Sequence, residues 1–243
     1  MVRIFQEKDL ILKSNLENNF KNYLIEKYSQ EIAKKIERIY TLHNSIDISI
    51  INQEEVEYWK EKLGAKLLPT GSLRIKKNKK LSELSGFKEG KWWVQDISSS
   101  IPIKLVGKIK NMEVLDLFSA PGGKAMQLIA LGANVTCIDS SSIRIKKLKE
   151  NLTRMNMNAD VFQTDFYDFK SKKKFDLVLI DVPCSSTGTI RKNKEIQYLD
   201  PFKRLKNLLK IQEDSLNVAK NFVKDKGYIL YCNCSLFFSE GED

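Results

Sequence analysis

The chain has 243 residues, enough for one large or two small domains with a buried core. Its formal net charge of +10 favours a polyanionic partner such as nucleic acid, although an excess of lysine can equally serve solubility. No apolar run reaches the roughly 18 residues of a membrane span, and charge follows the first residues too closely for a signal peptide. We therefore expect a cytoplasmic protein with no membrane contact.

Residues 1–90 are predicted to form a small, basic α+β module. Apolar residues at helical spacing predict a pair of helices between residues 16 and 40, with Ser29 as the N-cap of the second. The elements expected next are a turn at His43–Ser45, an alternating strand at Ile46–Ile50, a short helix at Glu54–Leu63 and a loop-rich stretch from Gly64 to Gly90. The cations clustered in residues 74–80 could bind the phosphates of a nucleic-acid backbone or lie in a solvated loop.

Residues 91–243 are predicted to form a second domain, which is organised around the stretch from Glu113 to Gln127. The paired tryptophans of Lys91–Asp96 are expected to be packing anchors, and a helix from Ser98 to Ile109 follows them. The run Val114–Phe118, apolar except for one acid, has the length and branching of a buried parallel strand.

The segment that follows this strand, Ala120-Pro121-Gly122-Gly123, predicts a ligand-binding turn. Pro121 removes a ladder donor, the glycines let the backbone approach a ligand, and Lys124 to Leu131 resumes at helical spacing. A strand, a glycine turn and a helix N-terminus form a nucleotide-type cradle at the carboxyl edge of an α/β sheet. The motif is not G-x-G-x-x-G, which disfavours a plain dinucleotide fold, and a tight turn without a ligand is the alternative.

Strands and helices alternate through the rest of the chain. Strands are expected at Asn134–Asp139, Val161–Phe162, Phe175–Ile180 and Tyr228–Cys232. Helices are expected at Ser141–Met155 and from Asp200, an N-cap with Pro201 at the first helical position, to about Lys226, where Gly227 ends the helix. This alternation predicts an α/β fold with a parallel, doubly wound sheet. A second cluster of cations, at Lys170–Lys174, could be a phosphate-tracking patch or a solvated loop.

Three acids stand at or just after the ends of consecutive predicted strands: Asp139, Asp165 and Asp181. Ligands bind outside the carboxyl ends of such strands, where Asp139 could take both ribose hydroxyls of an adenosine and Asp165 could meet the adenine edge. Asp139 could instead cap the next helix. A cationic sulfonium ligand would explain a cradle without phosphate-binding character, which favours S-adenosylmethionine over NAD or ATP.

Two of the four cysteines, Cys184 and Cys234, follow strand ends on the same predicted rim. Cytosine C5 becomes nucleophilic when a thiolate adds to C6, and a hydrogen bond at N3 supports that addition, so a cysteine and a carboxylate beside a methyl donor fit this reaction. Cys137 and Cys232 are expected to be buried small hydrophobes. Neither a disulfide framework nor a metal site is expected, because the chain has no C-x-x-C motif and His43 is its only histidine.

Four motifs together resemble the Sun/RsmB family of S-adenosylmethionine-dependent RNA cytosine-5 methyltransferases. They are V-Q-D, L-D-L-F-S-A-P-G-G-K, D-V-P-C-S-S-T-G-T-I-R-K and C-N-C-S-L-F-F-S-E-G-E, in the family's order over residues 90–243. The resemblance implies a Rossmann-like class I methyltransferase sheet (91–243) preceded by a small RNA-binding module (1–90). It also implies further C-terminal strands that the sequence lacks, so that the last predicted strand needs a missing segment or a partner to cover its edge.

The resemblance also assigns residues to the predicted reaction. The S-adenosylmethionine site would comprise Phe118, Ser119, Ala120, Pro121, Gly122, Gly123, Lys124, Asp139, Asp165 and Asp181. Cys234 would attack C6, Asp181 would support the ring at N3, and Cys184 would assist release of the product.

The expected function is thus methylation of C5 of a cytosine in RNA, with small-subunit (16S) ribosomal RNA as the substrate. The alternatives are a transfer RNA cytosine-5 methyltransferase, which the site residues do not distinguish, and a truncated RNA-binding relic that holds the cofactor without turnover.

Overall fold

The computed structural model describes residue 16 and residues 18–39, 45–76, 80–193, 195–196 and 200–241. The chain folds into two compact units, which are built from the described residues of 1–44, 184–209 and 234–243 and of 45–183 and 210–233. The predicted turn at His43–Ser45 lies largely outside the described residues. The functional division at residue 90 stays a prediction.

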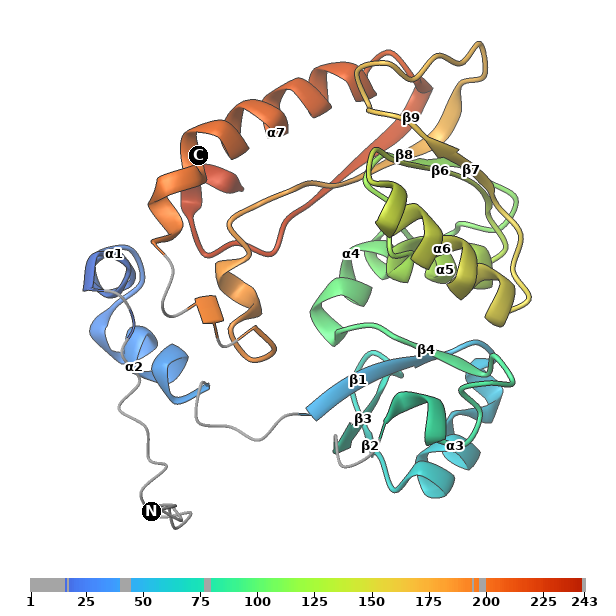
Figure 1. Ribbon diagram of the computed structural model, residues 1–243, viewed down its shortest axis with the longest axis horizontal. Coiled ribbons are helices and arrows are strands. Elements are labelled where there is room, and N and C mark those ends of the chain that lie inside the picture. The colour runs from blue at the N-terminus through green and yellow to red at the C-terminus, as the bar shows by residue number, and fades with distance from the viewer. Residues whose placement is uncertain are drawn as a thin grey trace. The chain divides into compact units, whose positions relative to one another are not determined.

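A five-stranded parallel sheet forms the centre of the second unit (Figure 1). In spatial order its strands are β7 (Asp160–Gln163), β6 (Asn134–Asp139), β5 (Glu113–Asp116), β8 (Phe175–Asp181) and β9 (Val223–Cys232). The chain crosses from β7 on one edge to β8 beside β5, so the order reverses direction at β5, and ligands of such sheets bind at this reversal. The predicted α/β class with a doubly wound parallel sheet is therefore confirmed.

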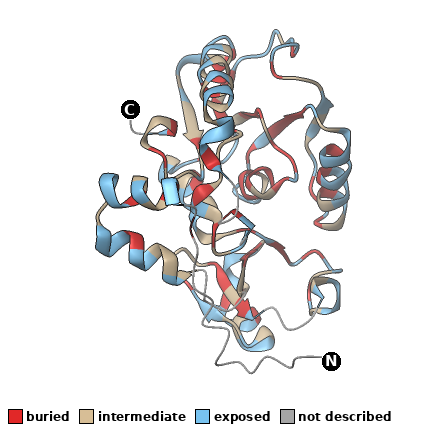
Figure 2. Cartoon of the chain, turned by 60° about the vertical axis from the view of Figure 1, so that its left-hand side comes forward, coloured by how far each residue is buried: buried red, intermediate tan, exposed pale blue. Residues whose placement is uncertain are grey.

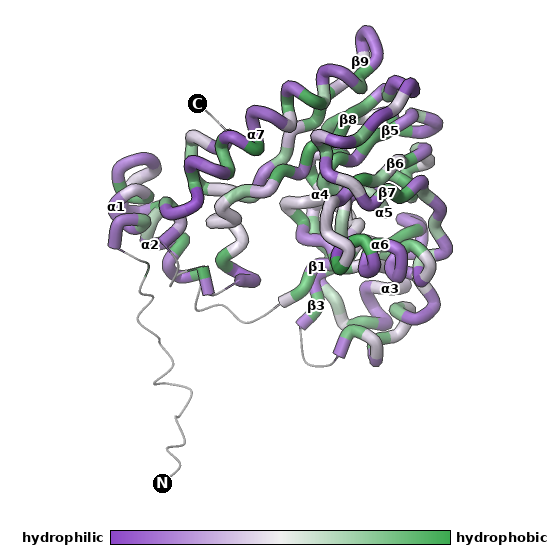
Figure 3. Tube along the Cα trace, turned by 45° about the horizontal axis from the view of Figure 1, so that its top comes forward, coloured by the Kyte–Doolittle hydropathy of each residue, from purple (hydrophilic) through white to green (hydrophobic). Residues whose placement is uncertain are grey.

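Two apolar layers cover the faces of this sheet. One layer contains residues of α4 (Ile97–Val106), α5 (Gly123–Ala130) and α6 (Ser142–Arg154), and the other contains residues from the second half of α7 (Leu205–Ala219). The central strands are buried on both sides, as their continuous apolar sequences require (Figures 2 and 3).

A small antiparallel sheet precedes the parallel one in the same unit. Its order is β2 (Lys66–Leu67), β3 (Leu73–Lys76), β1 (Ser45–Ile50) and β4 (Trp92–Val94), and α3 (Val56–Leu63) packs on it. The expectation of loop between Gly64 and Gly90 is wrong in part, because β2 is too short and β3 too basic to show in the sequence. Trp92 and Trp93 alternate as strand residues do: Trp92 packs in the core of the small sheet, and Trp93 in that of the parallel sheet.

Two helices begin the first unit, α1 (Asn18–Lys27) and α2 (Gln30–Ile39), as predicted. The Ser29 hydroxyl accepts a hydrogen bond from the backbone N–H of Ile32 at 3.2 Å, which confirms Ser29 as a capping residue. Apolar residues of both helices share a core with Ile190, Ile196 and Phe237. The helical pair therefore packs on the two loops that follow Cys184 and Cys234.

The last predicted helix differs from the observed one at both ends. Asp200 caps the backbone N–H of Phe202 as expected, but Pro201–Arg204 is a 3-10 turn before α7. The helix ends at Ala219 rather than near Lys226, because Phe222 packs on Phe169 with ring centroids 5.2 Å apart and its carbonyl accepts the N–H of Phe175. Gly227 lies inside β9, at a register shift, where a side chain would meet the Asp176 carbonyl at 3.0 Å.

Candidate active site

The turn between β5 and α5 is shaped by Gly122. Its φ of 106° is in the left-handed region, and a Cβ atom there would lie 2.5 Å from Cδ1 of Leu148, so only glycine fits. The Ser119 hydroxyl donates to the carbonyl of Ile138 at 3.1 Å, which ties the turn to β6. No side chain caps the N-terminus of α5, where Gly122 is the N-cap. The turn thus leaves backbone N–H groups open at the carboxyl end of the sheet.

Asp116, the acid inside the strand run, is fully enclosed at the end of β5. Its side chain is 1% exposed, and neither carboxylate oxygen has a hydrogen-bond partner among the residues that the structure describes. Burial and, secondarily, the charge of Asp181 raise the pKa of Asp116 to about 8. Asp116 was not among the predicted site residues, although an acid that interrupts a buried strand is a signal for a functional role.

Lys124 and Asp181 form an ion pair at the same edge. The Lys124 Nζ lies 2.6 Å from Oδ1 of Asp181, and its side chain is 10% exposed while that of Asp181 is 41% exposed. The lysine of the predicted turn therefore holds the carboxylate at the end of β8. Both residues were predicted to be in the site, but their pairing was not.

Asp139 divides its two oxygens between structure and an open position. Oδ1 accepts the backbone N–H of Ser141 at 2.9 Å and pairs with Arg144 at 2.9 Å, whereas Oδ2 is buried with no partner among the described residues. Ser141 itself is the N-cap of α6. The alternative that Asp139 caps the next helix is therefore wrong, because Ser141 is the cap, and the role of Asp139 toward a ligand stays a prediction.

Asp165, the third strand-end acid, lies in the turn after β7. Its carboxylate accepts the backbone N–H of Tyr167 at 3.1 Å, and the residue is half-buried. Phe118 of the turn packs on the neighbouring Phe166, with ring centroids 5.2 Å apart. These contacts place an aromatic surface next to Asp165.

The residues at this edge fit S-adenosylmethionine. Buried carboxylate oxygens without partners, on Asp116 and Asp139, suit a ligand that carries positive charge and hydroxyl donors better than a phosphate. The turn at Gly122 supplies backbone N–H groups that no side chain caps. Among the described residues, no group of three or more histidine, cysteine or acidic side chains could hold a metal ion, and no helix is long and apolar enough to cross a membrane.

Cys184 and Cys234 meet in the first unit. Their Sγ atoms are 3.3 Å apart, and the backbone N–H of Cys234 donates to the sulfur of Cys184 at 3.4 Å. The hydrogen bond from the Cys234 thiol, followed by backbone N–H bonds from Cys234 and Ser186, lowers the pKa of Cys184 to about 7. A substantial fraction of Cys184 is therefore thiolate at neutral pH.

Glu240 joins the two loops that carry these cysteines. Its side chain is 2% exposed; one oxygen accepts the backbone N–H of Ser185 at 2.9 Å, and the other accepts the hydroxyl of Ser235. Ser185 and Ser235 also bond to each other through their hydroxyls at 2.8 Å. Glu240 was not among the predicted site residues, because nothing in its spacing from Cys184 indicates that the two loops meet.

The other two cysteines differ in every relevant property. Cys137 in β6 and Cys232 at the end of β9 are buried. Burial raises the pKa of Cys137 strongly and that of Cys232 to about 11, so both stay protonated at neutral pH. Their prediction as small hydrophobic core residues is confirmed.

The predicted site residues are distributed over both units. The turn, Lys124 and the strand-end acids belong to the second unit, whereas Cys184, Cys234 and Glu240 belong to the first. Along the chain, Asp181 and Cys184 are separated only by Val182 and Pro183. The second unit thus carries the acidic cradle, which is the turn from Phe118 to Lys124 with the acids Asp116, Asp139, Asp165 and Asp181. The first unit carries the pair of thiols, Cys184 and Cys234.

Comparison with known proteins gives consistent matches. A family model described as 16S rRNA methyltransferase RsmB/F matches residues 105–243, more than half of the chain. The chain is 33% identical over 162 residues to Ribosomal RNA small subunit methyltransferase B of Photorhabdus laumondii, a match covering 65% of this chain and 38% of that protein. It is 27% identical over 261 residues to the protein of the same name from Proteus mirabilis, covering 99% and 62%.

The chain thus spans less than two thirds of the length of these curated relatives. Among solved structures, the crystal structure of PH0851 superimposes with a TM-score of 0.86 and 26% identity. That match covers 100% of this chain and 58% of the other. The small antiparallel sheet and the parallel sheet therefore both have counterparts in a solved structure.

Proposed function

The chain belongs to the RsmB/F family of 16S rRNA methyltransferases, and from this premise we propose that it transfers a methyl group from S-adenosylmethionine to C5 of a cytosine in RNA. Small-subunit ribosomal RNA is the proposed substrate, since the matching relatives are named for it. The observation that carries the cytosine-5 chemistry is the contact between the Cys184 and Cys234 sulfurs. The family resemblance seen in the sequence motifs is confirmed.

The residues at the carboxyl edge of the parallel sheet would hold the cofactor. S-adenosylmethionine supplies an electrophilic methyl group when it is bound. The turn from Phe118 to Lys124 would contact it through backbone atoms, Asp139 would accept from the ribose hydroxyls through its free Oδ2, and Asp165 would meet the adenine edge. Asp116 would supply a buried carboxyl group near the cationic end of the cofactor, whose positive charge would favour the ionised form of Asp116.

The cysteines would make the cytosine ring reactive. The Cys234 thiol would pass its proton to the Cys184 thiolate while its sulfur forms a bond to C6, and the displaced electron pair would pass to C5. Asp181 in its protonated form would donate a hydrogen bond to N3 and so support the addition. C5 would then accept the methyl group. Loss of the C5 proton to a base, with cleavage of the bond between sulfur and C6, would release the product. The lowered pKa of Cys184 supports it as the group that assists this release.

A methyl-transfer assay tests this proposal directly. Unmodified small-subunit ribosomal RNA is incubated with labelled S-adenosylmethionine and then digested to nucleosides. Label in 5-methylcytidine is expected with the wild type and absent with Cys234→Ala. Cys232→Ala serves as the control, because it makes the same change at a buried cysteine that does not belong to the pair. Label that persists in Cys234→Ala would refute the assigned nucleophile.

A second outcome distinguishes a wrong RNA substrate from a lack of methyltransferase activity. Wild-type protein that binds the cofactor but leaves ribosomal RNA unlabelled would exclude this substrate, and transfer RNA would then be tested in the same assay. Failure with both RNAs would refute the methyltransferase activity of this chain.

A further inference from the structure

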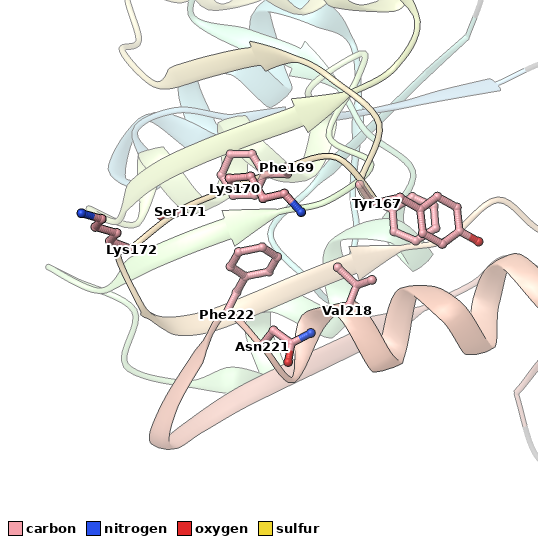
Figure 4. Close-up of a pocket in the computed structure, with 9 residues that line it drawn as sticks. Tyr167, Phe169, Lys170, Ser171, Lys172, Val218, Asn221 and Phe222 are labelled. Carbon is pink, nitrogen blue, oxygen red and sulfur yellow. The ribbon is translucent and has the colours of Figure 1, made fainter.

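An open pocket of about 470 Å³ lies between the loop that follows β7 and the end of α7. Its lining includes Phe166, Tyr167 and Phe169 after β7, Lys170 and Lys172 before β8, and Phe222 before β9 (Figure 4). Lys170–Lys172 and Phe222 precede the amino ends of their strands, whereas the acids stand at carboxyl ends. Phe166 and Tyr167 directly follow Asp165, so the pocket begins beside the proposed cofactor site and extends from it toward the amino ends of β8 and β9.

Aromatic rings make up the apolar part of this pocket. The rings of Phe166 and Tyr167 contact each other with centroids 4.0 Å apart and planes tilted by 32°, and Phe169 packs on Phe222 at 5.2 Å. The Tyr167 hydroxyl donates to Asp214 at 2.5 Å, which fixes a ring that is 50% exposed. A held and half-exposed aromatic ring is a platform on which a flat group can stack.

The lysines before β8 form two pairs with different roles. Lys173 pairs with Glu113 at 2.5 Å, and Lys174 donates to the carbonyl of Asn221 at 2.6 Å, so these two hold the loop in place. Lys170 and Lys172 have no hydrogen bond or ion pair with any residue in the described part of the chain. Figure 4 shows the Lys170 amine directed into the pocket and that of Lys172 directed away from it along the loop. Two cations on a fixed loop thus remain available to anions.

We propose that this pocket binds a nucleotide of single-stranded RNA, with the base against Tyr167 and neighbouring phosphates at Lys170 and Lys172. A base has a flat apolar face and a phosphate has negative charge, which together match a platform beside unpaired cations. The proposal rests on the proposed function in taking RNA as the partner.

Fluorescence anisotropy of a short labelled oligouridylate, titrated with the full chain, tests the pocket. The Lys170→Ala/Lys172→Ala variant is expected to bind at least several-fold more weakly than wild type. Its log–log salt slope should be lower by about 1.4, because each phosphate contact to single-stranded nucleic acid contributes about 0.7. Lys108→Ala/Lys147→Ala is the matched control, since it removes the same charge from exposed residues outside the pocket.

Photocrosslinking distinguishes a nucleotide site from a merely cationic patch. Oligonucleotide carrying 4-thiouridine is expected to crosslink to the peptide that contains Tyr167, and this crosslink should be lost in Lys170→Ala/Lys172→Ala. Equal weakening by both double variants, or crosslinks only to other peptides, would overturn the proposal. Thermal unfolding of each variant verifies that it is folded. Methyl transfer is assayed separately, so binding through the pocket without methylation would refute the proposed function and leave the pocket standing.

Discussion

The Sγ atoms of Cys184 and Cys234 lie 3.3 Å apart, although 50 residues separate the two cysteines in the sequence. The contact joins the loop after β8 to the loop after β9, and both loops lie in the same compact unit. The ionisation of one thiol therefore depends on the other, because the proton of Cys234 stabilises the thiolate of Cys184. Differences between variants of the two residues follow from this relationship.

Replacement of Cys184 should trap the reaction after methyl transfer. If Cys234 forms the bond to C6 and Cys184 assists release, Cys184→Ala will accumulate a covalent complex between protein and RNA that survives denaturing electrophoresis. Cys234→Ala will form no such complex, and neither will the double variant Cys184→Ala/Cys234→Ala. A covalent complex in Cys234→Ala but not in Cys184→Ala would reverse the two roles.

Mild oxidation should link the same two cysteines. A disulfide requires sulfurs about 2.05 Å apart, so a small movement from 3.3 Å suffices. Hydrogen peroxide would oxidise the Cys184 thiolate to a sulfenic acid with loss of one hydroxide, and the Cys234 thiol would displace the oxygen as water to form the disulfide. Peptide mapping is expected to find a bond between Cys184 and Cys234, with methyl transfer lost and then restored by dithiothreitol.

The buried cysteines provide the internal control for this oxidation. Cys137 and Cys232 have raised pKa values and little access to solvent, so both should remain as free thiols under the same peroxide treatment. Oxidation of all four cysteines at similar rates would contradict the selective reactivity inferred for the pair.

Glu240 is expected to act by positioning the two thiols. Glu240→Ala leaves the Ser185 N–H without its acceptor, and such a loss costs about 1–3 kcal/mol when the group is buried. We expect it to lower methyl transfer by about tenfold or more, which corresponds to about 1.4 kcal/mol in the barrier. Glu240→Gln keeps an acceptor for Ser185 and a polar partner for Ser235, so it should retain most of the activity.

The rate of thiol alkylation against pH separates positioning from general destabilisation. The negative charge of Glu240 opposes ionisation of Cys184, so Glu240→Gln should move the alkylation profile of Cys184 to lower pH. In Glu240→Ala the two thiols should no longer titrate as a pair, and the profile should approach that of an ordinary cysteine. An unchanged profile in both variants would show that Glu240 does not act on the cysteines.

The fold was predictable from the sequence wherever a signal is local. The apolar runs of β5, β6 and β8 and the Pro121-Gly122 turn determine strand, turn and helix within a few residues of each other. The end of α7 was not predictable, because it depends on Phe222 packing against Phe169, a residue from another part of the chain. Strand β2 was missed because it is too short to establish a period, and β3 because its four residues include two cations.

In the site, too, residues with a local signal were predictable and contacts between distant residues were not. Motif residues such as Lys124 and Asp181 could be selected, since each stands beside a recognisable strand end. Their ion pair at 2.6 Å was not predictable, because it requires knowing that β8 lies next to β5. Glu240 was missed for a similar reason, since its partners come from two loops that meet only in the folded chain.

Asp116 should make the stability of the protein fall as pH rises. In the unfolded chain this carboxyl would titrate near its ordinary value of 3.8, whereas in the folded protein burial and the charge of Asp181 raise its pKa to about 8. Between these values the folded state holds a proton that the unfolded state has lost. The free energy of unfolding should therefore decrease from about pH 4 to about pH 8, by up to about 1.4 kcal/mol per pH unit, and then level off.

Thermal unfolding of Asp116→Asn tests this dependence, since asparagine has nearly the same shape and cannot titrate. Its melting temperature is expected to decline less between pH 5 and pH 8 than that of the wild type, and to exceed it at pH 8. Asp176→Asn is the control: the hydrogen bond from Lys224 lowers the pKa of Asp176, so its contribution is present at neutral pH and is lost only as acid protonates it. That variant should be less stable than wild type at pH 8 and leave the decline between pH 5 and pH 8 in place. A wild type with no such decline would mean that Asp116 is ionised in the folded protein.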